Sequence, residues 1–195
     1  MSSIFGSPAH IAFVVPDLNE ALARLAASGI GPAFELRRVR GSNYYRGEPI
    51  EAVVSAAFVC SGDTLLEFIT PHDDARTTFR EFLDRNPNGG LHHIAYVSSD
   101  FDRSIARAKE QQGIDFRIVL EDRNGEGGKP HQVYVEPVGI DNPVLLQLHR
   151  PGALQLFYDT VRTAARDWDG SHPIRDAMPF LAAEPHLEGI ESEPI

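Results

Sequence analysis

The sequence predicts an α+β fold built from two copies of one unit, in which a strand is followed by a helix and three more strands. The first observation is an internal repeat: residues 10–18 (HIAFVVPDL) match residues 93–101 (HIAYVSSDF). A second pair of matching stretches lies downstream, at 65–68 (LLEF) and 145–148 (LLQL). The second observation is the hydrophobic pattern, which changes from strand-like to helical and back again within each copy.

The first copy begins with an apolar strand, expected at 10–15. Asp17, with Glu20 three residues later, predicts the start of a helix. Apolar residues recur at helical spacing as far as Leu25, and Gly29 ends the helix. Three further strands are expected at 34–39, 53–59 and 65–70.

The second copy repeats this order. A strand is expected at 93–98, and Asp100 caps a helix whose apolar face includes Phe101, Ile105 and Ala108. Three strands follow, at 116–120, 132–136 and 144–148.

The repeat also predicts how the chain is divided. The expected parts are one domain at 8–150, its modules 8–71 and 91–150, a linker at 72–90 with a short helix, and a C-terminal segment at 151–195. In that segment, apolar residues from Leu154 to Trp168 recur at helical spacing, and this face either covers the sheet of its own chain or offers a dimer contact. From Asp169 onward Pro, Glu and Gly dominate, so an irregular tail is expected.

Composition excludes several kinds of partner. The chain has 195 residues, 18 Lys and Arg against 28 Asp and Glu, and a formal net charge of −10, which argues against nucleic acid binding. No apolar stretch approaches the ~20 residues of a membrane span, and no secretory leader is visible. A single cysteine, Cys60, cannot form an internal disulfide, so a cytoplasmic protein is expected. The glycine-rich stretch 125–129 lacks the ending of a phosphate loop and predicts a turn.

Four polar residues lie at matched repeat positions on apolar strands. His10 and His93 begin the first strand of each copy, and Glu67 and Gln147 lie in the last strand of each. A buried carboxylate without a partner is costly, so Glu67 requires a proton, a cation or a metal nearby. The repeat brings the four residues to a pseudo-twofold axis, where they predict one divalent metal ion, which is Zn, Ni, Co, Mn or Fe(II).

Each of these residues taken alone has an ordinary structural interpretation. A strand histidine is commonly a core or surface residue with one hydrogen bond, and a strand glutamate commonly faces water. The symmetric placement of four such residues favours the metal site instead. His92, next to His93, is either a packing residue or a partner that orients a metal ligand.

The paired His-Ile-Ala strands, each followed by an Asp-capped helix and a Gly-Ile, resemble the vicinal oxygen chelate superfamily. That superfamily includes glyoxalase I, methylmalonyl-CoA epimerase, extradiol dioxygenases and bleomycin-resistance proteins. Residues 89–96 (GGLHHIAY) are especially similar to its epimerase and glyoxalase-like branch. The resemblance covers about residues 8–150 and implies a cupped mixed sheet around the metal, as well as a homodimer. The family's metal ligands fall on His10, Glu67, His93 and Gln147.

The sequence departs from the epimerase pattern in two ways. In the epimerase the last-strand ligand is a glutamate and its first-copy counterpart a glutamine, whereas here the carboxylate is Glu67 and the amide is Gln147. The epimerase's further catalytic glutamate on the third strand has no clear match here. The metal site is therefore expected to resemble the family's, and the reaction is expected to differ in detail.

The reaction class expected from these residues is that of a metal-dependent lyase or isomerase, including epimerases, which polarises the carbonyl of a small organic substrate. Glu67 is expected to act as ligand and catalytic base. Substrate-facing candidates are Tyr44, Tyr45 and Arg46, on a loop after the second strand, together with Tyr134 and His131. Arg46 suits a substrate carboxylate, although this loop suits packing or a dimer contact equally well.

Two other functions stay open at the level of sequence. One is an Fe(II) ring-cleaving dioxygenase, for which two histidines and one carboxylate suffice. The other is a non-catalytic small-molecule-binding protein of the bleomycin-resistance type. Such proteins typically lack the metal ligands, so the presence of His10, Glu67 and His93 counts against this class.

Overall fold

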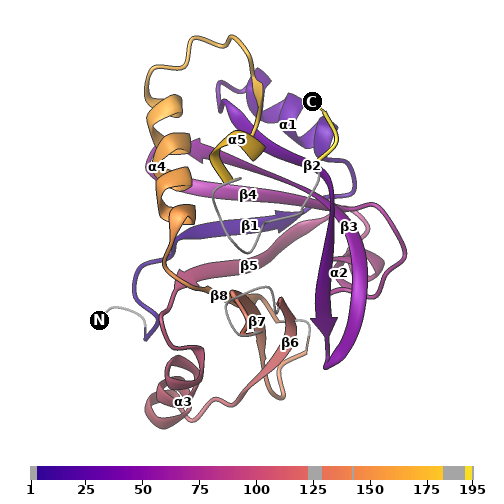
Figure 1. The fold of residues 1–195 in the computed structure, drawn as a ribbon, viewed down its shortest axis with the longest axis vertical. Coiled ribbons are helices and arrows are strands. Elements are labelled where there is room, and N and C mark those ends of the chain that lie inside the picture. The colour runs from indigo at the N-terminus through magenta and orange to yellow at the C-terminus, as the bar shows by residue number, and fades with distance from the viewer. Residues whose placement is uncertain (1–3, 123–128, 142, 182–191, 195) are drawn as a thin grey trace.

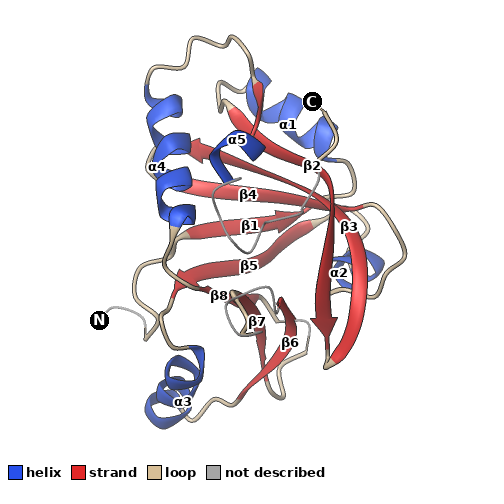
Figure 2. Ribbon diagram, viewed as in Figure 1, coloured by secondary structure: helices blue, strands red, loops and turns tan. Residues whose placement is uncertain are grey.

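A closed ring of strands forms the body of the protein. The computed structural model describes residues 4–122, 129–141, 143–181 and 192–194. Its nine-stranded sheet has the order β3-β4-β1-β5-β8-β7-β6-β2-β9, and β2 also pairs with β3. Because β2 pairs with both β6 and β3, the first eight strands close on themselves, and helices lie around the ring (Figures 1 and 2). The mixed sheet with a few helices agrees with the α+β fold predicted from the repeat.

Each copy of the repeat contributes four strands in the predicted order. The first copy consists of β1 (His10–Val14), α1 (Leu18–Ala27), β2 (Ala33–Tyr45), β3 (Glu48–Ser61) and β4 (Thr64–Pro71). The helix α2 (Thr78–Arg85) follows it. The second copy consists of β5 (Gly90–Val97), α3 (Phe101–Gln112), β6 (Phe116–Asp122), β7 (Gln132–Pro137) and β8 (Leu145–His149). The turn predicted at 125–129 lies mostly outside the described residues.

Side-chain caps fix where the helices begin. The carboxylate of Asp17 accepts a hydrogen bond from the backbone N–H of Glu20 at 3.0 Å, and Asp100 accepts one from the N–H of Arg103 at the same distance. These contacts satisfy N–H groups that no earlier turn of helix can reach. The caps predicted at Asp17 and Asp100 are confirmed. The linking helix, expected to begin at Asp73, begins five residues later at Thr78, because Thr77 is its cap.

The hairpin of β2 and β3 is much longer than predicted. The strands have 13 and 14 residues, and they turn at Arg46 and Gly47, both of which have positive φ. Tyr44 and Tyr45 therefore lie within β2, where they pair with Pro49 and Glu48 on β3, so their prediction as loop residues was wrong. Polar side chains after residue 36 break the apolar pattern of β2, and only pairing with distant strands shows that the strand continues.

The C-terminal segment packs on the ring of its own chain. The helix α4 (Ala153–Arg166) contacts β3, and its apolar face buries Phe157, Tyr158 and Val161. Of the two uses expected for this face, the structure thus shows the intramolecular one. Residues 174–181, expected to be irregular, instead form β9 (Ile174–Asp176), which pairs with β2, and the short helix α5 (Met178–Leu181). Among the described residues, no helix is long and apolar enough to span a membrane.

Candidate metal centre and cavity

Two alanines at matched repeat positions set the floor of the site. Ala12 on β1 and Ala95 on β5 are both 0% exposed. Each alanine has two of the predicted ligands as cross-strand neighbours: Glu67 and His93 flank Ala12, and His10 and Gln147 flank Ala95. Paired residues of neighbouring strands project to the same face of a sheet. The register therefore places all four long side chains on one face, and the small methyl groups between them leave room for a common centre.

Three of these side chains converge closely. Nε2 of His10 lies 3.1 Å from Oε2 of Glu67, and Nε2 of His93 lies 3.4 Å from the same oxygen. All three residues are buried, and one ligand atom from each lies within 4.8 Å of the others. Within the part of the chain that the structure describes, these three side chains have the spacing that a metal site requires.

The orientation of these atoms fits metal binding better than mutual hydrogen bonding. Despite the short separations, both Nε2 atoms and Oε2 of Glu67 lack an aligned hydrogen-bond partner. Leaving a buried polar atom unsatisfied costs about 1–3 kcal/mol, so several together need a common explanation. Atoms that point toward a shared centre instead of toward one another are what a divalent cation requires. The residues present therefore fit a metal ion.

The protonation states also suit metal binding. Burial would raise the pKa of the Glu67 carboxyl, but the adjacent rings of His10 and His93 outweigh burial and hold that pKa well below its usual range. Burial lowers the pKa of His93, even though Glu67 opposes this. At neutral pH the structure thus favours an ionised Glu67 and a neutral His93, which are the forms that bind a metal.

His92 orients His93 from behind. The two Nδ1 atoms lie 2.9 Å apart, and the His92 ring packs against Phe79 and Phe82 with centroids at 5.1 and 5.3 Å. Burial holds the pKa of His92 well below its usual value, so this ring is neutral. One ring must donate the proton they share, and a hydrogen bond through Nδ1 keeps Nε2 of His93 directed at Glu67. His92 is therefore both a packing residue and an orienting one.

Gln147 lies on the same floor with its amide fixed from one side. Its Nε2 donates to the hydroxyl of Tyr134 at 2.8 Å and to Oε1 of Gln132 at 2.9 Å. Its own Oε1 is buried without a partner. With both amide hydrogens engaged, the oxygen is the atom left for a fourth ligand contact.

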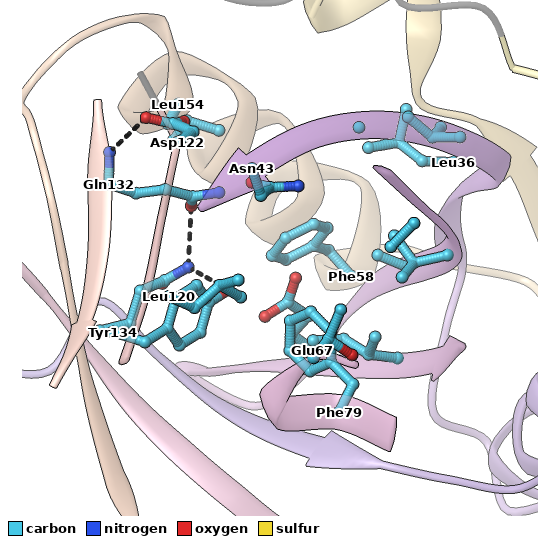
Figure 3. Close-up of a pocket in the computed structure, with 18 of the residues that line it drawn as sticks. Leu36, Asn43, Phe58, Glu67, Phe79, Leu120, Asp122, Gln132, Tyr134 and Leu154 are labelled. Carbon is cyan, nitrogen blue, oxygen red and sulfur yellow. Dashed lines mark hydrogen bonds between the residues drawn. The ribbon is translucent and has the colours of Figure 1, made fainter. Parts of the chain in front are cut away.

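A cavity of about 190 Å³ opens above this floor (Figure 3). The wall formed by β2 and β3 is mostly apolar and includes Leu36, Val54 and Phe58. The opposite wall, from β6 to β8, carries the polar groups that Figure 3 connects by hydrogen bonds: Asp122, Gln132, Tyr134 and Gln147. The carboxylate of Glu67 points into the space between the walls.

Asp122 and Gln132 line the cavity but were not predicted as site residues from the sequence. Asp122 is 3% exposed, and its Oδ1 accepts hydrogen bonds from the backbone N–H groups of His131 and Gln132. Burial nevertheless raises the pKa of Asp122 to about 6. A signal existed for Gln132, since strand alternation places it on the same face as Tyr134. None existed for Asp122, because the predicted strand ended two residues before it.

The structure brings one of the predicted substrate-facing residues into the cavity and leaves the others outside its lining. Tyr134 lines the cavity. Tyr45 is buried in a core cluster, and Arg46 forms ion pairs with Glu81 and Glu136 at 3.6 and 3.2 Å, where it lines a separate small groove. Tyr44 and His131 are not among the described residues that line the cavity.

The family model and the similar proteins of known function indicate the same family. The family model of the glyoxalase/bleomycin resistance protein/dioxygenase superfamily matches residues 9–134. The chain is 30% identical over 125 residues to the mitochondrial methylmalonyl-CoA epimerase of Bos taurus, covering 62% of this chain and 62% of that protein. It is also 30% identical over 123 residues to the ethylmalonyl-CoA/methylmalonyl-CoA epimerase of Cereibacter sphaeroides, covering 62% of this chain and 81% of that protein.

A solved structure shares the fold. The crystal structure of methylmalonyl-CoA epimerase from Mycobacterium tuberculosis superposes with a TM-score of 0.52 at 20% sequence identity, covering 78% of this chain and 92% of that one. At this identity the similarity establishes the fold alone. The helices α4 and α5 lie beyond the residues that the family model matches.

Proposed function

The chain belongs to the glyoxalase/bleomycin resistance protein/dioxygenase superfamily, and we propose that it is a metal-dependent isomerase or lyase, of which an epimerase is the favoured form. The observation that carries this proposal is the buried cluster of His10, Glu67 and His93, whose ligand atoms lie within 4.8 Å of one another without aligned hydrogen bonds. The similarity to epimerases supports the reaction class.

The metal would be held by residues from both copies of the repeat. His10, Glu67 and His93 would supply three ligand atoms, and Oε1 of Gln147 would supply the fourth. A divalent cation bound there would polarise a substrate carbonyl and make the adjacent C–H bond more acidic.

The chain's own residues would then handle the proton. Glu67 would accept it on its carboxylate, which points into the cavity (Figure 3) and is ionised at neutral pH because its pKa is held low. Burial keeps the pKa of Tyr134 well above its usual value, so its phenol stays protonated while its oxygen holds the Gln147 amide.

A second carboxyl group supports epimerisation over elimination. Inverting a stereocentre requires one group to remove a proton from one face and another to return it on the opposite face. Asp122 lies on the β6 side of the cavity, whereas Glu67 lies on β4. With a pKa of about 6, Asp122 is able to carry a proton in part of its population near neutral pH.

The two other functions differ from this proposal in measurable ways. A dioxygenase would use the same two histidines and one carboxylate with iron, and would consume oxygen. A binding protein of the bleomycin-resistance type would need no metal, and a buried group of three unpartnered ligand atoms would then be a cost without a purpose.

Metal analysis tests the proposal first. We expect the purified protein to hold about one equivalent of Zn, Ni, Co, Mn or Fe per chain, measured by elemental analysis after dialysis. The His10→Ala/His93→Ala variant should lose it, whereas His172→Ala, which removes an exposed imidazole, should keep it. Unchanged metal content in the double variant would refute the metal site.

Solvent exchange tests the reaction. NMR in deuterated buffer should show metal-dependent loss of the α-proton from 3-hydroxybutan-2-one or from methylmalonyl-CoA. Oxygen uptake with catechol and iron, in place of exchange, would identify a dioxygenase and overturn the proposed reaction.

A further inference from the structure

The C-terminal segment closes the side of the cavity that the repeat leaves open. Leu154 and Tyr158 on α4 and Leu181 on α5 line the same cavity as Glu67. All three residues lie after residue 134, where the match to the family model ends. The repeat therefore supplies the proposed metal ligands and the two walls of the cavity. The segment after it supplies the roof, which consists of Leu154, Tyr158 and Leu181.

The roof is held firmly. Phe157 is 1% exposed, and its ring packs edge-on against Phe58 and Phe34 with centroids at 5.3 and 6.0 Å. Next in the chain, β9 pairs with β2, and the N–H of Ala177 donates to the carbonyl of Glu35 at 3.0 Å. These contacts hold the segment that carries Leu154, Tyr158 and Leu181 against the strands that form the cavity.

One roof residue reaches the metal centre itself. The ring of Tyr158 stands edge-on to His10 with centroids 5.6 Å apart, and it lies 5.9 Å from the ring of His149. A substrate carbonyl at the centre would thus lie directly beneath the roof.

The charges that line the cavity restrict what it accepts. Among the described lining residues the acidic ones are Glu67 and Asp122, and none is Lys or Arg. A divalent cation would be balanced by these two carboxylates, which leaves no positive charge among the described lining residues for a second anionic group. A carboxylate or phosphate on the body of the substrate would therefore be desolvated without a partner.

The volume of the cavity also favours a small substrate. The volume of about 190 Å³ lies below the ~300–1,000 Å³ of common ligand pockets. The aliphatic side chains of Leu36, Val54, Leu154 and Leu181 favour a hydrocarbon surface.

We propose that the roof formed by Leu154, Tyr158 and Leu181 determines substrate selectivity, and that the cavity takes an uncharged, compact carbonyl compound with a hydrocarbon body instead of an acyl-CoA or a carboxylate. This inference rests on the proposed function, because the metal centre is where the carbonyl is expected to bind.

Binding measurements test the inference without relying on turnover. The probes are 2-hydroxyhexan-3-one, 5-hydroxy-4-oxohexanoate, which has a carboxylate in place of the terminal methyl group, and methylmalonyl-CoA. Saturation-transfer NMR and calorimetry on the metal-loaded protein should show the uncharged ketone binding at least about tenfold more tightly than either anion. Equal or tighter binding of either anion would overturn the inference.

Roof variants test which residues are responsible. Leu154→Trp should weaken binding of 2-hydroxyhexan-3-one by about tenfold or more by filling the cavity, with metal content unchanged. Leu154→Ala/Leu181→Ala should shift preference toward the longer 2-hydroxynonan-3-one. Leu156→Ala is the matched control, since Leu156 lies on α4 but is 71% exposed. If the roof variants bind like this control, the roof does not set selectivity.

The two proposals fail separately. If the uncharged ketone binds as expected and no α-proton exchanges, the proposed reaction is wrong and the assigned substrate class stands. If α-protons exchange in methylmalonyl-CoA and the ketone does not bind, the reaction stands and the substrate class is wrong.

Discussion

The two hairpins that face each other across the cavity occupy equivalent places in the repeat and differ in almost every property. The hairpin of β2 and β3 has strands of 13 and 14 residues and presents mostly apolar side chains, such as Val54 and Phe58. The hairpin of β6 and β7 has strands of 7 and 6 residues and presents Asp122, Gln132 and Tyr134.

In the floor of the cavity, by contrast, the two copies have equivalent residues at equivalent positions. Ala12 and Ala95 occupy the same position in each copy, and each has an imidazole and a second polar side chain as neighbours. A metal requires ligands at fixed separations, so the floor tolerates little change. A substrate wall has no such constraint, and here one wall is mostly apolar while the other carries polar groups.

The largest expected effect comes from the one difference in the floor, a carboxylate in the first copy and an amide in the second. Glu67→Ala should weaken metal binding by more than the ~10–100-fold that changes around ligands typically cause, because it removes the carboxylate ligand itself. Gln147→Ala should cost about tenfold at most. Metal titration by calorimetry measures both variants.

Exchanging the two side chains sharpens this comparison. If the copies are equivalent around the axis, Glu67→Gln/Gln147→Glu should bind the metal within about tenfold of the parent protein. A loss as large as that of Glu67→Ala would show that the floor is not symmetric in function.

The next effect concerns the helix α4, whose Phe157 packs against Phe34 on β2 and Phe58 on β3. Phe157→Ala should lower the free energy of unfolding by about 3–5 kcal/mol, because the ring is buried between two phenylalanines. Leu156→Ala on the same helix should change it by less than about 0.5 kcal/mol. Urea unfolding measures both, and similar values for the two would mean that α4 does not depend on the apolar wall.

A smaller effect on stability, which depends on pH, is expected when Asp122 on the polar wall is replaced. Burial raises the pKa of Asp122 to about 6 in the folded protein, so its contribution to stability is present at low pH and is lost as the pH rises toward 6. Asp122→Asn keeps the oxygen that accepts the two backbone N–H groups and removes the charge. The variant should therefore be more stable than the parent by roughly 3 kcal/mol above pH 6 and equal to it below about pH 4.

Urea midpoints measured across this pH range check that expectation. A parent protein that gains stability relative to the variant between pH 4 and 6 would show that Asp122 is stabilised as a carboxylate instead.

The smallest effect is expected outside the cavity. Arg46→Ala breaks ion pairs with Glu81 and Glu136 at a partly exposed site, so it should cost less than about 1 kcal/mol of stability. Binding of 2-hydroxyhexan-3-one should not change. A tenfold loss of binding in this variant would show that Arg46 contacts the substrate, as the sequence suggested.

The sequence by itself determined the repeat, the two capped helices and the residues that meet at the floor. These features depend on short-range patterns: strand alternation, the spacing of a cap, and identity between copies. Because a repeat carries its register with it, matched positions such as His10 and His93 must approach one another once the copies pair. The clustering of these two residues with Glu67 was predicted from strand alternation and the match between the two copies.

Only the tertiary structure decided the walls and the roof. The length of β2, the burial of Asp122 and the placement of Leu154 and Leu181 in the lining of the cavity depend on contacts between residues far apart in the chain. The sequence around a polar strand residue such as Asp122 is the same whether its side chain faces water or a cavity. The same is true of an apolar residue in a C-terminal segment, such as Leu181. Their partners, which only folding brings together, are what distinguish the two cases.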